Sequence, residues 1–218
     1  MKKIIFDKNR YKDRESKAQY IFDTYSDDLV NKKILNIGSG QGLVKKCLPN
    51  NSNYFEVDAF GHPDLIINLE EQLPLPFEGQ SYDTVICTDV LEHLDNLHDV
   101  LEEIFRISKN NLIISLPNCY NSFYQGIFTK QKKPLKYYGL PNEKPNDRHK
   151  WFFSSTDIMN FFENYKSDEI RELQFRLLNV RSREKSLKNF FRILLRIILG
   201  KYSTNFLCTT VFIKIVKK

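Results

Sequence analysis

Short apolar runs alternate with amphipathic stretches along most of this chain. Runs of Ile, Val, Leu and aromatic residues, bounded by turn residues, predict strands at 33–37, 53–58, 64–67, 82–88 and 111–116. Between the last two strands, apolar residues from Leu97 to Phe105 recur every three or four positions and predict a helix with one buried face. Strands that alternate with helices predict an α/β layered fold.

The last part of the chain has a different order of elements. Ser154, with Asp157 three residues later, is typical of a helix N-terminus, and the apolar stripe that follows predicts a helix over about residues 155–165. Residues 170–182 and 205–216 then both resemble strands. Two closing strands in succession predict an antiparallel hairpin added to a parallel sheet. We therefore expect a Rossmann-like, seven-stranded, mostly parallel sheet with helices on both faces.

Two segments stand outside this alternating pattern. We expect residues 1–32 to form a helical cover over the sheet. Residues 117–153 contain aromatics, Lys and Pro but no helix or strand periodicity, and a loop of this length in a compact domain usually serves as a lid or a binding loop. With a core at 33–118 and a lid at 119–153, residues 1–218 are expected to form one domain.

The composition is that of an ordinary globular domain, with 41% hydrophobic and 28% charged residues. The four cysteines lie far apart, which predicts neither a zinc site nor a disulfide framework, so we expect no metal and reduced thiols in a cytoplasm. The basic N-terminus is followed by too few apolar residues for a signal peptide. No apolar run reaches the roughly 18 residues that a membrane-spanning helix needs.

Charge is distributed unevenly along the chain. The net charge of +6 arises near the C-terminus, because residues 185–218 hold eight basic residues and no acidic ones. No RNA-binding or zinc-finger motif accompanies these residues, so we expect no nucleic-acid partner.

The basic segment is also amphipathic. Within residues 185–201, Lys188, Arg192 and Arg196 recur every four positions and give a predicted helix one basic stripe on an otherwise apolar surface. A helix of about 22 Å is too short to span a bilayer. It can lie on an anionic surface such as the inner membrane, pack on the sheet, or join two copies of the chain in a homodimer, and the sequence leaves these alternatives open.

The candidate chemistry lies where the strands end. The strand at 33–37 runs into a glycine-rich turn, Gly38-Ser39-Gly40-Gln41-Gly42, whose backbone can approach a ligand closely. A dinucleotide-binding turn needs a third glycine at position 43, which is Leu43 here. Polar residues also follow later strands, and they are Asp58, Asn68, Thr88 and Asp89. Ligands of open α/β sheets bind at this edge.

These motifs and their order resemble those of the class I S-adenosylmethionine-dependent methyltransferases of the type 11-like group. The stretches that carry the resemblance are ILNIGSGQG, FEVDAF, LPLPFEGQSYDTVICTDVLEHL and LIISLPN, between residue 33 and about residue 118. The later stretch KYYGLPNEKPNDRHKWFFSSTDIMNFF is similar to bacterial members that modify cell-surface glycans or small metabolites. The resemblance implies S-adenosylmethionine as the cofactor and methyl transfer to an oxygen or nitrogen atom of a small-molecule, glycan or lipid-linked acceptor.

The resemblance also implies a role for each strand end. The glycine turn packs against the methionine and ribose of the cofactor, Asp58 binds the ribose hydroxyls, and Asn68 flanks the adenine. The residues of this predicted cofactor site are Asn36, Gly38, Ser39, Gly40, Gly42, Asp58, Ala59, Asn68, Leu69, Thr88 and Asp89. The family usually has an acid at positions 36 and 68, so Asn36 and Asn68 remove negative charge beside a cationic cofactor.

The acceptor side is less defined by the sequence. His149, in the lid, is the candidate general base or acceptor ligand, because a neutral imidazole can remove a hydroxyl proton near neutral pH. His93 is interpreted as a packing or capping residue. Two alternatives stay open: a methyltransferase-like subunit that binds the cofactor without turnover, which Asn36 and Asn68 motivate, and a nicotinamide oxidoreductase, which Leu43 disfavours.

Overall fold

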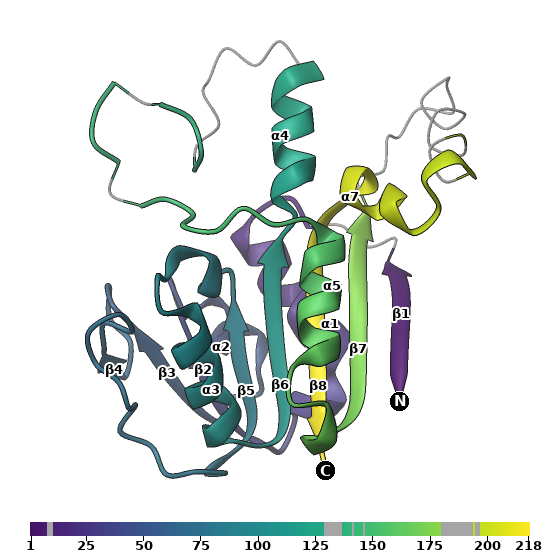
Figure 1. The fold of residues 1–218 in the computed structure, drawn as a ribbon. Helices are drawn as coiled ribbons and strands as arrows, with labels where there is room; N and C mark the ends of the chain where they lie inside the picture. Colours follow the sequence, from purple (N-terminus) through teal and green to yellow (C-terminus); the bar gives the residue numbers. More distant parts are fainter. Residues whose placement is uncertain (8–10, 129–136, 141, 146, 180–193, 195–196) are drawn as a thin grey trace.

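The strands form one sheet in the spatial order β1-β7-β8-β6-β5-β2-β3-β4 (Figure 1). The computed structural model describes residues 1–7, 11–128, 137–140, 142–145, 147–179, 194 and 197–218. The strands are β1 (Lys2–Asp7), β2 (Lys33–Ile37), β3 (Asn53–Asp58), β4 (Leu65–Ile66), β5 (Tyr82–Thr88), β6 (Ser108–Pro117), β7 (Ile170–Asn179) and β8 (Cys208–Lys217). The helices are α1 (Arg14–Leu29), α2 (Leu43–Cys47), α3 (Leu97–Ile107), α4 (Cys119–Phe128), α5 (Ser155–Asn164) and α7 (Thr204–Leu207). Short 3₁₀ turns are η1 (Leu91–His93), η2 (Ser167–Glu169) and η3 (Gly200–Ser203).

The strand directions confirm a mostly parallel sheet. β2 pairs in parallel with β3 and β5, and β5 pairs in parallel with β6. β8 runs antiparallel to both of its neighbours, β6 and β7, so the predicted C-terminal antiparallel pair is also confirmed. The carboxyl ends of β2, β3, β4 and β5 therefore meet along one edge of the sheet, where the predicted site residues lie.

The N-terminal segment differs from the prediction. Residues 1–32 were expected to be helical, and α1 is, but Lys2–Asp7 forms an eighth strand that pairs in parallel with β7. Its sequence is short and begins with two lysines, and Ile4 and Phe6 are 43% and 53% exposed. An edge strand of this kind buries too little apolar surface to show a clear periodic pattern.

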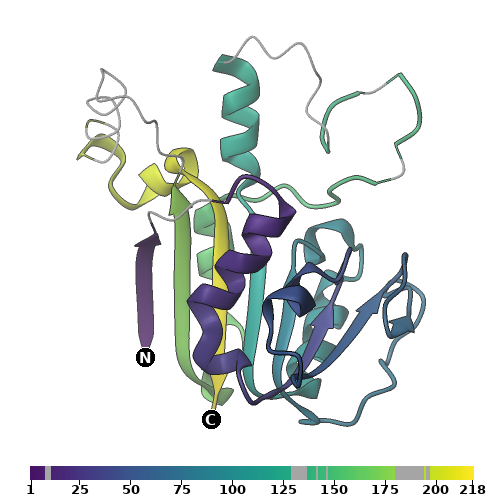
Figure 2. The same ribbon diagram turned by 180° about the vertical axis from the view of Figure 1, so that it is seen from behind.

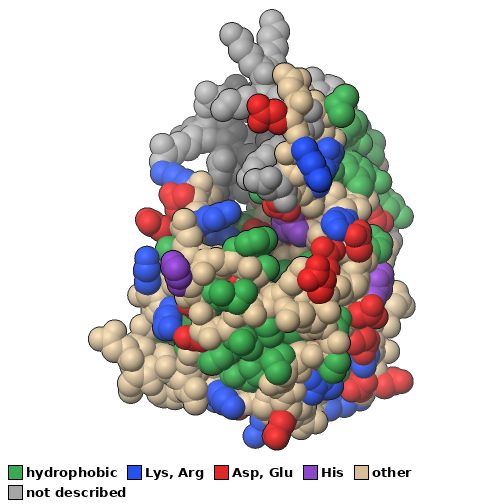
Figure 3. Space-filling model, turned by 90° about the vertical axis from the view of Figure 1, so that its left-hand side faces the viewer, with side chains coloured by type: hydrophobic (Ala, Val, Ile, Leu, Met, Phe, Trp, Pro, Cys, Tyr) green, Lys and Arg blue, Asp and Glu red, His purple; other side chains and the backbone are tan. Residues whose placement is uncertain are grey.

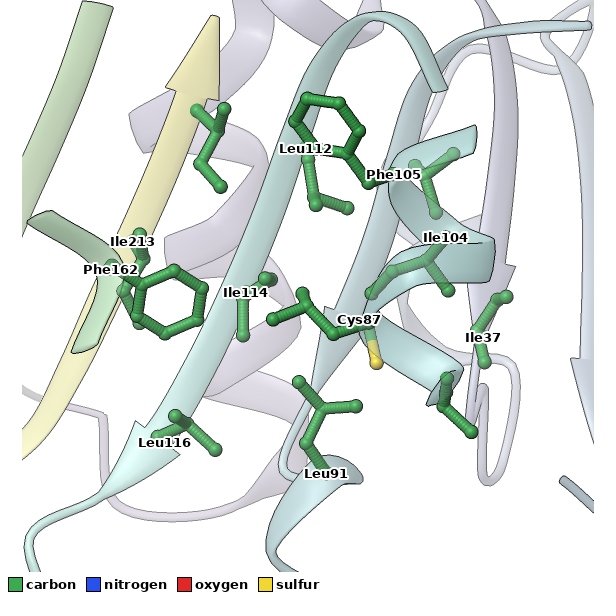
Figure 4. Close-up of a cluster of buried hydrophobic side chains, with 14 of the residues drawn as sticks. Ile37, Cys87, Leu91, Ile104, Phe105, Leu112, Ile114, Leu116, Phe162 and Ile213 are labelled. Carbon is green, nitrogen blue, oxygen red and sulfur yellow. The ribbon is translucent and has the colours of Figure 1, made fainter. Parts of the chain in front are cut away.

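Helices cover both faces of the sheet. Figures 1 and 2 show α3 and α5 on one face and α1 with α2 on the other. Along β2, Leu35 and Ile37 point into the core under α3 and α5, whereas Ile34 points into the core under α1. This alternation is what a strand buried on both faces requires. Figure 4 shows how side chains from β5, β6, α3 and α5 fill the larger core.

The two predicted helices form where the sequence indicates. α3 buries Val100, Leu101 and Ile104 completely, as its spacing requires. α5 begins at the predicted capping residue, because Ser154 accepts a hydrogen bond from the Asp157 backbone and Asp157 accepts one from Ser154 in return.

Residues 117–153 were expected to lack regular structure, but Cys119–Phe128 forms α4, which rises from the carboxyl edge of the sheet (Figure 1). Side chains before and within α4 anchor it, since Asn118 donates to the Cys208 carbonyl at 2.7 Å and Asn121 donates to the Phe206 carbonyl. Its apolar residues are mostly aromatic and pack on neighbours such as Phe206, so they give no simple helical stripe in the sequence.

The predicted helix at 185–201 lies largely outside the described residues. Of that range, Leu194 and residues 197–199 are helical, and Ile197 and Ile198 are 74% and 68% exposed. In the described part of the chain, no helix combines the length and apolar character that crossing a bilayer requires. Figure 3 views the side on which β4 lies, where acidic and basic side chains are interspersed with histidines among them.

Candidate active site

The glycine turn after β2 has a backbone that only glycine adopts easily. Gly38, Gly40 and Gly42 have φ angles of 71°, 60° and 63°. A Cβ on Gly38 would lie 2.1 Å from Cγ2 of Val90, so the turn packs directly on the segment that follows β5. A Cβ on Gly40 would meet no atom of the described residues within 4 Å. Gly38 therefore serves packing, and Gly40 leaves room for a ligand to approach the backbone.

Asp58 is fixed against this turn at the end of β3. Its Oδ2 accepts a hydrogen bond from the Gly40 backbone N–H at 2.7 Å, and its Oδ1 accepts one from the Phe60 N–H at 3.0 Å. Ala59, which stands between Asp58 and Phe60 in the sequence, is half-buried. Each carboxylate oxygen keeps a second lone pair, so Asp58 can accept further hydrogen bonds from a ligand at the turn.

A buried acid, which was not among the predicted site residues, lies beneath the glycine turn. Asn36 is buried and donates from Nδ2 to the Tyr54 hydroxyl at 2.7 Å. Its register partner on β3 is Glu56, whose carboxylate oxygens lie 3.3 Å from the position of a Cβ on Gly42. Oε2 of Glu56 is buried and has no hydrogen-bond partner among the described residues. Burial, with a further contribution from Glu56, raises the pKa of Tyr54. The negative charge that Asn36 lacks is thus carried by its neighbour.

Asn68 and Leu69 follow β4, whose Ile66 is the register partner of Asp58. Oδ1 of Asn68 accepts a hydrogen bond from the Glu70 N–H at 3.1 Å, so this side chain closes the turn in which it lies. Leu69 is buried, and its carbonyl accepts a hydrogen bond from the Asn96 side chain. The two residues are placed beside the end of β3 by these local bonds.

Thr88 ends β5, and Asp89 turns the chain out of the sheet. Asp89 has a φ of 55°, which is unusual for a residue other than glycine. Its carboxylate is held on both oxygens, by the Ser115 hydroxyl at 2.6 Å and by the Lys17 ammonium at 2.6 Å. The charge of Asp89 is therefore balanced by a lysine from α1.

Three side chains that the sequence did not group together form a cluster beyond Asp89. Glu92, His93 and His149 each offer one ligand atom, and these atoms all lie within 4.8 Å of one another. Glu92 is only 1% exposed, and its Oε2 has no hydrogen-bond partner in the part of the chain that the structure describes. Burial, with the nearby Asp89 charge, raises the pKa of Glu92 well above its ordinary value. His93, which its sequence context indicated as a packing or capping residue, is a member of this cluster.

Both imidazoles of the cluster have a partner on Nδ1. His93 Nδ1 lies 2.6 Å from an Asp147 carboxylate oxygen. His149 Nδ1 lies 2.6 Å from the Tyr138 hydroxyl, and this hydroxyl donates its own proton to Cys119 Sγ. With that hydroxyl proton directed at Cys119, the Tyr138 oxygen can accept a hydrogen bond from Nδ1 of His149. Both partners can therefore accept a hydrogen bond from Nδ1, which leaves Nε2 of each ring to face the cluster.

The segment that carries His149 is tied to η1 by backbone and side-chain bonds. The Lys150 N–H donates to the Glu92 carbonyl at 2.8 Å, and the Lys150 ammonium pairs with Glu70 at 2.9 Å and with Asp95. The Trp151 indole donates to the Leu94 carbonyl at 2.7 Å. These bonds hold His149 beside Glu92, although the two residues are far apart in the sequence.

The cluster and the glycine turn are neighbours. Gly38 packs on Val90, and Glu92 follows Val90 by two residues in the same turn of chain. The carboxyl edge of the sheet therefore combines an open glycine turn with a fixed Asp58 and, next to it, a Glu–His–His cluster. A separate hollow of about 540 Å³ lies near the opposite edge, lined by residues such as Gly79, Arg106 and Lys217. None of the residues of the glycine turn, Asp58 or the Glu–His–His cluster lines this hollow.

Comparison with known proteins adds to this geometry. A family model described as a methyltransferase domain matches residues 7–166. A SAM-dependent methyltransferase from Archaeoglobus fulgidus is similar in structure, with a TM-score of 0.59, 15% identity, and coverage of 94% of this chain and 94% of that chain. A SAM-dependent methyltransferase from Thermotoga maritima has a TM-score of 0.56 at 16% identity, covering 92% of this chain and 89% of that chain. No curated protein matches the sequence.

Proposed function

This chain belongs to the S-adenosylmethionine-dependent methyltransferase family, and from that membership we propose that it methylates an oxygen or nitrogen atom of a small-molecule, glycan or lipid-linked acceptor. The fold and the cofactor follow from the family. The acceptor and the roles of individual residues are our inference from the carboxyl edge of the sheet.

The residues at this edge fit the cofactor. The backbone at Gly40 faces open space, and Asp58 holds a carboxylate beside it that can accept hydrogen bonds from the ribose hydroxyls. Glu56 supplies a buried negative charge beneath the turn, which suits a cationic ligand. In the proposed cofactor site, Asn68 and Leu69 lie on the adenine side. Thr88 and Asp89 form the floor of that site.

Asp58 and the glycine turn would hold S-adenosylmethionine, which would supply a sulfonium methyl group for transfer to a lone pair of the acceptor, with the neutral thioether as the leaving group. The leaving group is activated by its own charge, so the main task of the protein is to position the acceptor. A hydroxyl acceptor must in addition lose a proton, whereas an unprotonated amine attacks directly.

We assign the acceptor side to the Glu92–His93–His149 cluster. The observation that carries this assignment is the contact of Gly38 with Val90, which puts the cluster one turn of chain away from the cofactor turn. His149 and its stacked neighbour Tyr137, with ring centroids 4.1 Å apart, give this side an aromatic and titratable lining. A polar acceptor with a ring or a sugar suits such a lining.

Calorimetry with S-adenosylhomocysteine, followed by a screen for methyl incorporation, tests the proposal. We expect one cofactor site per chain and methyl transfer to an acceptor among metabolites, nucleotide-linked sugars or lipid-linked sugars. Absence of cofactor binding would contradict the assignment of the edge. Tight binding without incorporation into any of these pools would favour the alternative, a cofactor-binding subunit without turnover.

A lipid-linked acceptor would place the enzyme at a membrane surface. The basic residues of 185–201 and the exposed Ile197 and Ile198 support this second proposal, since cations and apolar side chains together favour an anionic lipid interface. Packing of the same segment against a second copy of the chain is the competing arrangement.

A further inference from the structure

We propose that Glu92, His93 and His149 bind a divalent transition-metal ion at the acceptor side of the site. The binding site itself follows from the contacts of these three residues, and only its part in catalysis rests on the proposed function. One carboxylate and two imidazoles are a common ligand set for such ions, and three protein ligands leave coordination positions open.

The two histidines are prepared to act as ligands. Nδ1 of His93 faces the Asp147 carboxylate, and Nδ1 of His149 lies 2.6 Å from the Tyr138 hydroxyl, so each ring can hold its proton on Nδ1 and present the lone pair of Nε2 to an ion. Histidine ligands of protein-bound metals almost always donate their other N–H to a carboxylate, carbonyl or water, which fixes the tautomer and orients the ring. In this cluster a carboxylate supports one histidine and a hydroxyl supports the other.

Glu92 provides an independent observation. It is 1% exposed, and its Oε2 is buried with no hydrogen-bond partner in the described ranges. A buried carboxylate oxygen without a donor is costly, and such groups normally pair with a cation or a hydrogen-bond donor. Lys17, whose charge acts on Glu92, is engaged by Asp89 and Ser115. A bound metal ion would place a positive charge beside the Glu92 carboxylate and bond to the oxygen that has no partner among the described residues.

The distances allow a metal ion after a small adjustment. His93 Nε2 lies 3.9 Å from Glu92 Oε1, and the three ligand atoms fit within 4.8 Å. An ion bonded at about 2.1 Å holds neighbouring ligand atoms about 3.3 Å apart, so the side chains would close by about 1 Å. Rotation of the Glu92 side chain and of the half-buried imidazoles supplies movement of this size without a change of backbone.

The ligand set indicates which ions fit. Two imidazoles favour Zn²⁺, Mn²⁺, Fe²⁺ or Co²⁺ over Mg²⁺ and Ca²⁺, which prefer oxygen ligands. An acceptor hydroxyl at an open position would lose its proton more readily, because the ion lowers its pKa. His149 would then act as a ligand and not as the proton acceptor. This proposal also replaces our expectation of no metal, which rested on cysteine spacing alone.

Cobalt binding to the full-length, untagged chain tests the site. After treatment with a chelator, we expect Co²⁺ to bind one site per chain with visible absorption, and Zn²⁺ to displace it. Glu92→Gln, His93→Ala and His149→Ala should each weaken binding by about 100-fold. Asp147→Asn should weaken it by about 10-fold through the orientation of His93. His62→Gln, which changes an exposed histidine outside the cluster, is the matched control and should bind as the wild type does.

A second measurement separates metal binding from a structural role of Glu92. Without metal, Glu92→Gln should melt at or above the temperature of the wild type, since it removes a buried carboxyl group that has an oxygen without a hydrogen-bond partner in the described ranges, and Zn²⁺ should raise the melting temperature of the wild type only. A wild-type chain that binds no Co²⁺ at 100-fold molar excess would overturn the proposal, as would equal loss of binding in His62→Gln. Calorimetry with S-adenosylhomocysteine on the same samples keeps the two proposals apart: cofactor binding without metal binding refutes only the metal site, and the reverse result refutes only the proposed function.

Discussion

Asn36 of β2 and Glu56 of β3 are register partners with both side chains buried, and only one of the two carries a charge. Asn36 donates to Tyr54, and Glu56 places its carboxylate beneath Gly42. The resemblance to the family implies an acid at position 36. In this chain the acid stands one strand away, so a single negative charge is kept under the glycine turn.

This arrangement predicts that restoring the usual acid is harmful. Asn36→Asp would place a second buried carboxylate beside Glu56, and we expect a loss of about 1–3 kcal/mol in the free energy of unfolding, measured with urea. Adding Glu56→Gln to that variant should recover most of the loss, because one charge is removed again. Strictly additive effects of the two substitutions would show that the side chains do not interact.

The same substitution to alanine should cost different amounts of unfolding free energy at Gly38 and at Gly40. Gly38→Ala forces a Cβ to 2.1 Å from Val90 and also strains a φ of 71°, whereas Gly40→Ala strains a φ of 60° in open space. We expect about 1–2 kcal/mol for Gly40→Ala and about 1–3 kcal/mol more for Gly38→Ala. Urea unfolding checks the difference, and Val90→Ala should relieve part of it in Gly38→Ala. Equal losses in the two single variants would argue against a tight contact at Val90.

Asp58 is expected to carry much of the cofactor affinity. Asp58→Ala should weaken binding of S-adenosylhomocysteine by about 1.5–3 kcal/mol, since a charged hydrogen-bond acceptor is lost. Calorimetry measures the effect. Glu78→Ala, which removes an exposed carboxylate, is the matched control and should leave the affinity unchanged. Unchanged affinity in Asp58→Ala would remove this residue from the site.

His149 is expected to serve the acceptor and not the cofactor. His149→Ala should lower the rate of methyl transfer by about 100-fold or more, within the range for loss of a general base, while S-adenosylhomocysteine binds nearly as before. Tyr138→Phe removes the hydroxyl that holds Nδ1 and should give a smaller loss of rate. Wild-type turnover in His149→Ala would exclude both a base and a ligand role.

The C-terminal basic segment is expected to bind anionic vesicles. Each cation near the surface contributes about 1 kcal/mol, so Arg192→Glu with Arg196→Glu should abolish co-sedimentation at low salt. Lys46→Glu with Lys109→Glu makes the same change of net charge at two exposed positions elsewhere and should have a much smaller effect. A wild-type chain that stays in the supernatant would favour the packing or homodimer alternatives.

The positions of the candidate cofactor residues were predictable because their determinants are local. β2, β3 and β5 begin and end at the predicted residues, since each is a buried apolar run closed by turn-forming or polar residues. The glycine turn and Asp58 stand directly at two of these strand ends. Parallel pairing then brings them together without any further information.

The Glu92–His93–His149 cluster and the position of Glu56 depend on long-range contacts that no local sequence pattern indicates. Bonds such as that of the Lys150 N–H to the Glu92 carbonyl bring His149 to Glu92, and the register of β3 on β2 brings Glu56 to the turn. The signal that was available is the adjacent Glu92-His93 pair, placed just beyond the ligand-binding edge. α4 was missed because its aromatic residues pack on tertiary neighbours in place of a continuous stripe.

The position of β8 sets the order in which this sheet can be completed. Cys208–Lys217 lies between β6 and β7, so β7 and its edge partner β1 cannot join the rest of the sheet until these late residues have been synthesised. β2 to β6 can pair earlier, as their partners are already present. Ribosome-bound chains should therefore carry a half-built sheet with an open β6 edge, a state in which chaperone binding or misassociation is favoured.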